Sequence, residues 1–346
     1  MRALQDLSLE EIKAWLEPLG EPVFRAKQIF EWAHLYVDFN AMTNLSKSLR
    51  EKLSQDFTCQ PVEIFKEFKS VDGTIKFLYK LNDGELIEGV LMGYKYGYTL
   101  CVSTQVGCRM GCSFCASGLS GLIRNLTAGE ILGQVLAANA YLGGTITDRK
   151  ITNVVLMGSG EPLDNFDNVV KFIRLVSSPE GINISQRNIS LSTCGLADKI
   201  KKLTDENLGI TLTISLHATE DETRKKLMRV ANAYSLNEVM DAVRYYFNKT
   251  KRRVVFEYIM LPENTNHQDA LRLKSLTRGI SAHINLIRVN VNPETNTKPI
   301  SKEREQKFWK ALKDAGLSAT TRRTLGADIS GACGQLKRRV ISEGGL

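Results

Sequence analysis

Three cysteines on one short segment are the most reactive group of residues in the sequence. Cys108, Cys112 and Cys115 are spaced C-x3-C-x2-C within "CVSTQVGCRMGCSFCASG", and no fourth cysteine or histidine follows nearby. A structural zinc site takes four protein ligands, and an iron–sulfur cubane usually takes one thiolate for each iron. Three thiolates would therefore leave one iron of a [4Fe-4S] cluster open to an outside ligand.

An open iron can bind the amino and carboxylate groups of S-adenosylmethionine (SAM). An electron passed into its sulfonium then breaks a C–S bond and makes a carbon radical; the cofactors carry this chemistry, while the protein binds and orients them. Two alternatives are three structural cysteines without a metal, and zinc with a distant fourth ligand such as His217. The spacing, and Phe114 just before the last cysteine, favour the cluster.

The composition is that of a globular protein with a large core. Of the 346 residues, 43% are hydrophobic and 24% charged, so the chain does not need disulfides for stability. No stretch approaches the roughly 18 apolar residues of a membrane span, and "MRALQDLSLEEIKAW" lacks the apolar region of a signal peptide. We therefore expect a cytoplasmic protein without a membrane partner, in which an odd number of cysteines favours metal or redox chemistry.

The net charge of +8 suits a polyanionic partner such as RNA or DNA, although many cytoplasmic proteins are mildly basic. Three basic runs, at 249–253, 321–323 and 337–339, could contact phosphates. The last two flank Cys333 and favour RNA contact. The first is equally compatible with a solvated face.

The first 97 residues divide into two regions. Residues 1–60 carry helical spacing of apolar residues, and Ser8 with Glu11 forms a capping-box pattern, so this region predicts a small helical RNA-binding domain. Residues 61–97 are short β-rich runs separated by Asp-Gly pairs, which are typical of hairpin turns. They predict a β-meander linker.

From 98 to 326 strands alternate with helical patterns, which predicts a parallel sheet covered by helices. Six such units fit an α/β fold with a partial (β/α)6 barrel, and "SATTRR" could add a seventh strand. The predicted strands are 98–103, 152–157, 188–193, 209–216, 253–260 and 283–290. Residues 327–346 form a C-terminal segment that carries Cys333.

The polar motifs follow the strands. In parallel α/β folds, chemistry gathers in the loops at the carboxyl ends of the strands. The cysteine triplet follows the first strand of the barrel, "GSGEP" the second, "STCG" the third and "SLHA" the fourth. We expect these four loops to form one site.

Taken in order, "CRMGCSFCASGLSGLIRNLTAGEI", "MGSGEPLDN", "STCG", "SLHA" and "DISGACGQL" resemble the motifs of radical-SAM RNA methyltransferases of the RlmN/Cfr family. The resemblance covers essentially the whole chain and is greater to the RlmN branch. It implies a radical-SAM barrel that methylates C2 of an adenosine in the peptidyl-transferase centre of 23S rRNA, and C2 of the adenosine 3′ of the anticodon in tRNAs. The alternatives are methylation of C8, as in the Cfr branch, and a non-catalytic RNA-binding protein with a structural metal.

The resemblance also implies a mechanism. C2 of adenine is electron-poor and cannot simply attack the methyl group of SAM, but a carbon radical can add to it. By resemblance, Cys333 is the methyl carrier: one SAM methylates it, and a second SAM is split to a radical that activates this methyl group. The resulting adduct with RNA then needs Glu88 as the base for the C2 proton, and Cys101 as the thiol that attacks Cys333 and leaves a disulfide.

The family's SAM-binding positions fall on the strand ends. The resemblance implies that Gly160 and Glu161 hold the amino group, through the backbone carbonyl and the carboxylate. It places Ser192 and the 215–217 stretch against the ribose and methionine ends, and Asn290 against the carboxylate or ribose. The residues of that stretch are Ser215, Leu216 and His217. A monomer and an electron donor such as flavodoxin or ferredoxin are implied as well, while Cys194 and Cys59 have no assigned role.

Overall fold

A parallel sheet lies at the centre of the structure, as the alternation of strand and helix patterns predicts. The structure is a computed structural model, and it describes residues 1–119, 121–289 and 299–336. Neighbouring strands of this sheet are all parallel, and the predicted seventh strand is present at its edge. In spatial order, the strands are β6 (Gly97–Val102), β9 (Ile151–Leu156), β10 (Ile189–Thr193), β11 (Thr211–Ser215), β12 (Val254–Met260), β13 (Ala282–Arg288) and β14 (Ala319–Thr321).

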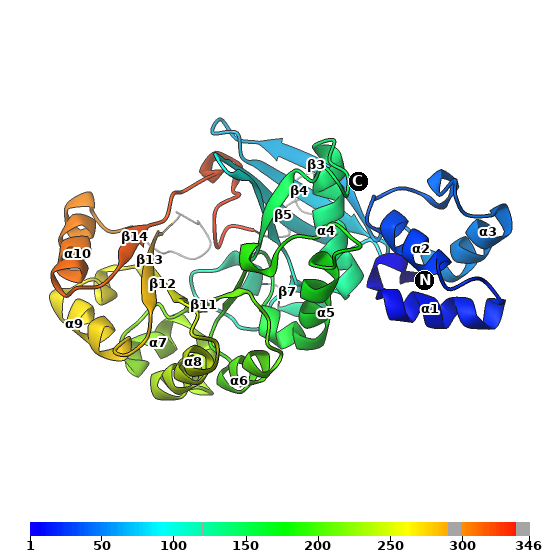
Figure 1. The fold of residues 1–346 in the computed structure, drawn as a ribbon. Coiled ribbons are helices and arrows are strands. Elements are labelled where there is room, and N and C mark those ends of the chain that lie inside the picture. The colour runs from blue at the N-terminus through cyan, green and yellow to red at the C-terminus, as the bar shows by residue number, and fades with distance from the viewer. Residues whose placement is uncertain (120, 290–298, 337–346) are drawn as a thin grey trace.

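Helices connect these strands and cover the outer face of the curved sheet (Figure 1). The apolar residues of α5 show why: Val169, Phe172, Ile173 and Val176 recur at helical spacing and are all buried. The result is the predicted α/β partial barrel. The connecting helices are α4 (Ala128–Tyr141), α5 (Phe166–Val176), α6 (Ala197–Asp205), α7 (Asp221–Leu227), α8 (Leu236–Thr250), α9 (His267–Leu276) and α10 (Lys302–Asp314).

The β-meander is continuous with the barrel sheet. Strands β3 (Val62–Lys69), β4 (Ile75–Leu81) and β5 (Leu86–Tyr94) are antiparallel, and β5 pairs with β6, which pairs in parallel with β9 on its other side. The Asp-Gly pairs lie in the two predicted turns, where Gly73 has a φ of 85° and Gly84 a φ of 89°. The meander strands therefore extend the sheet to ten strands within the described residues. The domain boundaries drawn from the sequence stay predictions.

The N-terminal helices pack to one side of the barrel (Figure 1). They are α1 (Leu9–Leu16), α2 (Arg25–Ala33) and α3 (Lys47–Asp56), and a short parallel pair, β1 (Arg2–Ala3) with β2 (Phe57–Thr58), closes the module. Ser8 and Glu11 form the predicted capping box. Asp6 joins the module to the barrel, because its Oδ1 accepts the N–H of Gly129 at 2.6 Å. None of the described helices combines the length and apolar character that a bilayer crossing demands.

Candidate functional site

The cysteine loop leaves the barrel on a short hairpin that the sequence did not predict. Strands β7 (Gln105–Gly107) and β8 (Leu122–Asn125) pair antiparallel, and the N–H of Cys108 donates to the carbonyl of Gly121 at 2.9 Å. Gly107 has a φ of 77°, and a Cβ there would lie 2.0 Å from the oxygen of Gly121. Only glycine fits at position 107, where the two strands of the hairpin meet. The hairpin brings both ends of the cysteine loop together, with the three cysteines between them.

The three thiols line one cavity at the carboxyl ends of the strands. The pKa of Cys108 is raised to about 12, mainly by burial and to a smaller extent by the charges of Glu161 and Cys115. Ionising these buried thiols therefore requires a nearby positive charge, which a metal centre supplies. Within the described chain, no three His, Cys, Asp or Glu side chains converge closely enough for a single metal ion. A cubane binds each thiolate through a different iron, so the donor set fits a cluster.

The C-terminal segment brings Cys333 to the same cavity. The N–H of Ala116 donates to the carbonyl of Gly334 at 2.8 Å, and Oγ of Ser117 donates to the carbonyl of Leu336 at 3.2 Å. Both donors directly follow the last cysteine of the triplet. The predicted methyl carrier is therefore held against the cysteine loop through the carbonyls of two residues on its C-terminal side.

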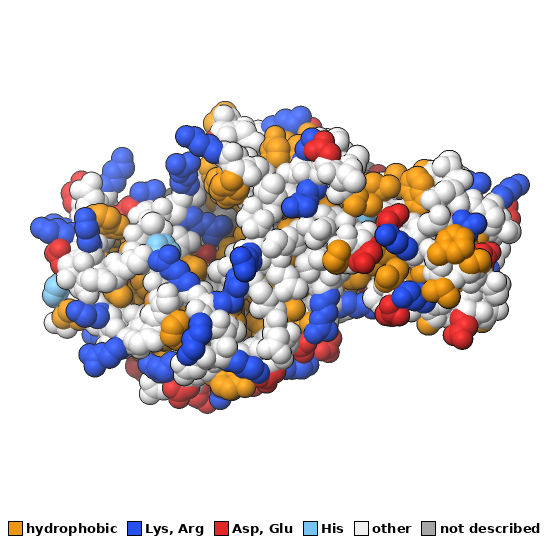
Figure 2. Space-filling view, in the orientation of Figure 1, with side chains coloured by type: hydrophobic (Ala, Val, Ile, Leu, Met, Phe, Trp, Pro, Cys, Tyr) orange, Lys and Arg blue, Asp and Glu red, His pale blue; other side chains and the backbone are white. Residues whose placement is uncertain are grey.

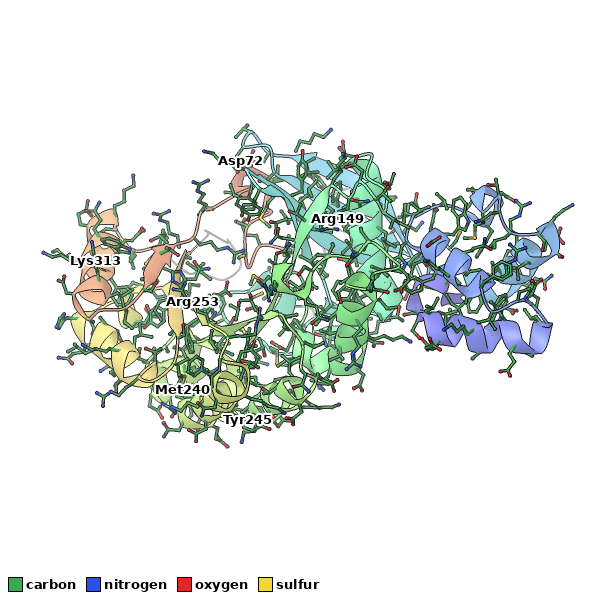
Figure 3. The ribbon with its side chains drawn as sticks, viewed as in Figure 1. Asp72, Arg149, Met240, Tyr245, Arg253 and Lys313 are labelled. Atoms are coloured by element: carbon green, nitrogen blue, oxygen red, sulfur yellow. The ribbon has the colours of Figure 1, made fainter. Side chains whose placement is uncertain are left out.

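The other end of this segment is anchored on the β3–β4 turn. Asp328 accepts hydrogen bonds from Oγ of Ser70 at 2.6 Å and from the N–H of Val71 at 3.2 Å. Asp72 accepts the N–H of Gly326 at 2.9 Å, and Figure 3 shows Asp72 at this turn, beside the segment. The meander thus positions the chain that leads to Cys333.

Most of the predicted SAM-binding residues meet in the cavity, which encloses about 1030 Å³ of space free of protein atoms, its open mouth included. Figure 2 shows a hollow in this face of the molecule, with Lys and Arg side chains around it. The predicted site residues that line the cavity are Cys108, Cys112, Cys115, Gly160, Glu161, Ser192, Ser215, His217 and Cys333. Asn290 lies outside the described residues, as does the basic run at 337–339.

Gly160 and Glu161 bring the second loop close to the first. Gly160 has a φ of 109°, and a Cβ there would lie 2.8 Å from the N atom of Gln105. The Glu161 carboxylate accepts the N–H groups of Leu163 at 3.0 Å and Cys194 at 2.8 Å, while burial raises its pKa. Two backbone donors already occupy this carboxylate, so its contact with the amino group of SAM stays a prediction.

His217 is a neutral hydrogen-bond donor at the end of β11. Its Nδ1 accepts the N–H of Ile259 at 3.1 Å, which leaves the ring proton on Nε2. Burial lowers its pKa to about 3, and the ring lies edge-on to Phe114 with centroids 4.9 Å apart. Leu216, predicted with it, is buried and does not line the cavity. Its carbonyl instead accepts Nε of Arg224 at 3.3 Å.

Arg224 is a residue that sequence reasoning missed. It is fully buried, and besides Leu216 its guanidinium donates to the carbonyls of Cys194 at 2.6 Å and Tyr234 at 3.3 Å. These carbonyls lie in the loops after β10 and β11 and in the segment before α8. Arg224 therefore ties together the loops that carry the predicted SAM contacts. A single arginine in a charged helix gives no signal of this role in the sequence.

Glu257 is a second missed residue. It lies on β12, is 5% exposed, and accepts Oγ of Ser192 at 3.2 Å; Oγ of Ser215 is 3.4 Å from that hydroxyl. Its other oxygen pairs with Nη1 of Arg322 at 3.1 Å. A carboxylate in the apolar run "VVFEYIML" was the signal that could have revealed it.

Cys101 lies in a second cavity that adjoins the first. Cys101 and Cys333 both line it, and burial raises the pKa of Cys101 to about 12, with the charge of Cys333 as the next cause. The disulfide expected between them is not present, and none of the seven cysteines, all of which are described, forms one. This corrects the expectation for the structure as it stands, which holds both sulfurs as thiols.

Glu88 does not line either of these two cavities. It is 5% exposed on β5, and its Oε1 lies 3.2 Å from Nζ of Lys76. It shares a strand face with Val90, two residues along, which lines the second cavity. The structure thus places Glu88 beside the sulfur cavity in a buried ion pair, and its role as the base stays a prediction.

The basic runs differ in their surroundings. Arg253 donates to Oγ of Ser318 at 2.8 Å at the amino end of β12, opposite the site, where Figure 3 labels it. Arg322, expected to contact phosphate, is instead paired with Glu257, while its neighbour Arg323 is exposed. Arg323 also lines the second of the two cavities described above, with Cys101 and Cys333.

Two family models match the chain. Residues 102–273 match "Radical SAM superfamily", and residues 3–59 match "Ribosomal RNA large subunit methyltransferase N-terminal domain". The first begins at the last residue of β6, includes the cysteine loop and ends within α9, and the second spans the N-terminal helices.

Full-length relatives agree with these matches. The chain is 50% identical over 344 residues to a Clostridium botulinum (strain Alaska E43 / Type E3) protein named "Probable dual-specificity RNA methyltransferase RlmN", covering 99% of this chain and 98% of the relative. A Clostridium perfringens (strain 13 / Type A) protein of the same name is 50% identical over 350 residues, covering 100% and 99%. A crystal structure of a radical SAM methyltransferase from Sphaerobacter thermophilus superposes with a TM-score of 0.92 at 42% identity, covering 97% of this chain and 99% of that one. The chain belongs to the RlmN family of radical SAM RNA methyltransferases.

Proposed function

We propose that this enzyme methylates C2 of an adenosine in the peptidyl-transferase centre of 23S rRNA, and C2 of the adenosine 3′ of the anticodon in tRNAs. The observation that carries the proposal is the shared cavity: the cysteine triplet, five predicted SAM contacts and Cys333 all line it. A methyl donor bound there would lie between the cysteine loop and the proposed carrier. The name of the relatives, which specifies a dual-specificity RNA methyltransferase, supports two RNA substrates.

We assign the cofactor contacts by the same geometry. Cys108, Cys112 and Cys115 would hold a [4Fe-4S] cluster. Bound, the cluster supplies the electron that splits SAM to a carbon radical. The chain's own residues orient the sulfonium: His217 presents an Nε2 donor, and the hydroxyls of Ser192 and Ser215 present groups that suit a ribose.

Cys333 would carry the methyl group, and two further residues would complete the cycle. Glu88 would take the proton from C2 of the RNA adduct. Cys101 would then attack the sulfur of Cys333, release the methylated base and leave a transient disulfide to be reduced before the next turnover. The resting structure, with both sulfurs as thiols in one cavity, is compatible with this cycle.

The setting of the enzyme completes the proposal. An electron donor such as flavodoxin or ferredoxin would reduce the cluster. We propose that the enzyme acts in the cytoplasm, where its proposed ribosomal and transfer RNA substrates occur, and that it acts as a monomer.

Two cysteine variants test the assignment. Cys333→Ala is expected to abolish RNA methylation and to form no covalent adduct, whereas Cys101→Ala is expected to accumulate protein crosslinked to RNA. Denaturing gels of anaerobic reactions with labelled RNA distinguish the two, and Cys59→Ala is the matched control because its half-buried thiol lies in the N-terminal module. Mass spectrometry of the digested RNA separates C2 from C8 products. Normal turnover by Cys333→Ala would refute the carrier role.

A further inference from the structure

One arginine stands on the boundary between the two cavities. Five residues line both, namely Met157, Ile287, Arg288, Arg322 and Cys333. Of the two cations, Arg288 is 51% exposed and forms a two-point ion pair with Glu305 on the outside. Arg322 is 24% exposed and pairs with Glu257 inside. Arg322 is therefore the cation that faces the interior of this boundary.

Three contacts fix the orientation of Arg322. Its backbone N–H donates to the carbonyl of Leu286 at 2.8 Å. Its Nη1 donates to Oε1 of Glu257 at 3.1 Å and lies 3.8 Å from Sδ of Met157. A guanidinium is planar, so fixing the backbone and one terminal nitrogen sets the direction of the remaining donors. Glu257 is itself held by Ser192, one of the predicted SAM contacts.

Besides Glu257, sulfur and phenol side chains act electrostatically on this guanidinium. The charge of Cys333 is the largest cause of the raised pKa of Arg322, and Cys101 and Tyr94 contribute further. Conversely, Arg322 opposes the effect of burial on Cys333, whose pKa burial raises. Hydrogen bonds thus connect Ser192 through Glu257 to Arg322, and Arg322 lines both cavities together with Cys333.

We propose that Arg322, held by Glu257, is a positioning residue that directs the sulfur of Cys333 toward the SAM cavity. The inference rests on the proposed carrier role of Cys333. In the transfer, the thiol of Cys333 first loses its proton to solvent. The new S–CH3 bond to Cys333 then forms as the S–CH3 bond of the SAM sulfonium breaks, and S-adenosylhomocysteine leaves with the electron pair of the broken bond. A guanidinium beside the sulfur stabilises the attacking anion and limits its rotation. The methylated sulfur is a neutral thioether, so this charge-based contact ends once the methyl group is loaded.

The first test is loading of Cys333 without RNA. Holoenzyme reconstituted under anaerobic conditions is mixed with SAM, and intact-protein mass spectrometry follows the gain of one CH2 unit. Arg322→Gln is expected to slow loading about tenfold or more, as for a lost charged hydrogen bond, with little change in KM for SAM. Arg322→Lys should recover part of the rate, because it keeps the charge without the planar fork. Arg187→Gln, which makes the same charge change at an exposed arginine before the amino end of β10 that lines neither cavity, should load at the wild-type rate.

The second test needs neither cluster nor SAM. The apoprotein is treated briefly with iodoacetamide, and peptide mass spectrometry gives the alkylation of Cys333 relative to Cys59. Arg322→Gln is expected to lower this ratio severalfold, while Arg187→Gln leaves it unchanged. Cys194, which is 6% exposed, should stay protected in every variant, which shows that the fold is intact.

The outcomes separate the two ideas. If wild-type Cys333 never gains a methyl group, the carrier role fails and this inference falls with it. If the wild-type protein gains the methyl group normally, two results would refute only the role of Arg322. One is methyl loading of Arg322→Gln at the wild-type rate, and the other is an alkylation ratio in Arg322→Gln equal to that of the wild type.

Discussion

Glu88 forms a buried ion pair with Lys76, and we propose that it is also the base that takes the C2 proton; these two roles can be tested separately. Its carboxylate lies 3.2 Å from Nζ of Lys76, with both side chains less than a tenth exposed. Replacing Glu88 by Gln leaves the ammonium of Lys76 buried without this counter-charge. Breaking a buried pair from one side costs about 3–5 kcal/mol of the free energy of unfolding. The ring of Phe68, 4.8 Å from Nζ, offsets only about 1 kcal/mol of that cost.

This cost sets the size of the expected effect. The net cost is about 2–4 kcal/mol. At roughly 2 °C per kcal/mol for a large domain, Glu88→Gln should therefore lower Tm by about 4–8 °C. The double variant Lys76→Met/Glu88→Gln removes the stranded charge and should regain most of the loss. Differential scanning calorimetry of the wild type, both single variants and the double variant measures the coupling between the two sites.

Activity assays on the same variants separate stability from catalysis. The double variant should be folded yet unable to remove the C2 proton, so that RNA adducts form without released product. An unchanged Tm in Glu88→Gln would refute the buried ion pair. Wild-type turnover by the stable double variant would refute the base role of Glu88.

Two further predictions concern the loops around the SAM cavity. The pKa of His217 is lowered to about 3 in the folded state from about 6.5 in the unfolded chain, so its contribution to stability is complete above pH 6.5 and is lost as the pH falls toward 3. Asparagine tolerates the φ of 59° at this position and has no group that titrates here. When the pH is lowered from about 7 to about 4.5, thermal unfolding should therefore show a smaller loss of stability for His217→Asn than for the wild type. An equal loss in both proteins would contradict a neutral imidazole at His217. Arg224→Met leaves three carbonyls without their hydrogen-bond donor, which should lower the free energy of unfolding by at least about 3 kcal/mol. The variant should also bind SAM more weakly in equilibrium dialysis. Unaltered SAM affinity would show that Arg224 does not hold these loops.

The sequence predicts the strands well because their apolar runs are short, regular and separated by polar motifs. Each predicted barrel strand, including the one in "SATTRR", is present within a few residues of its expected bounds. The continuity of the meander with the barrel was not predictable, because hydrogen bonds between β6 and both of its neighbours leave no trace in the apolar pattern of β6 alone.

The site was predictable where a motif marks it and not where tertiary contacts define it. The cysteine spacing and the strand-end motifs predict residues that do line one cavity. Arg224, Glu257 and Lys76 were missed because each acts through a partner far away in sequence. Leu216 fell within a correct motif but points into the core, since neighbouring residues at a strand end face opposite ways.

The measurement that tests the central claim most directly is an anaerobic reaction of the reconstituted, reduced enzyme with SAM labelled in its methyl group and with fragments of 23S rRNA and tRNA. The account predicts 5′-deoxyadenosine together with labelled 2-methyladenosine in the digested RNA. Protein that carries a fully loaded iron–sulfur centre, yet releases no 5′-deoxyadenosine and leaves C2 of adenosine unlabelled, would contradict it.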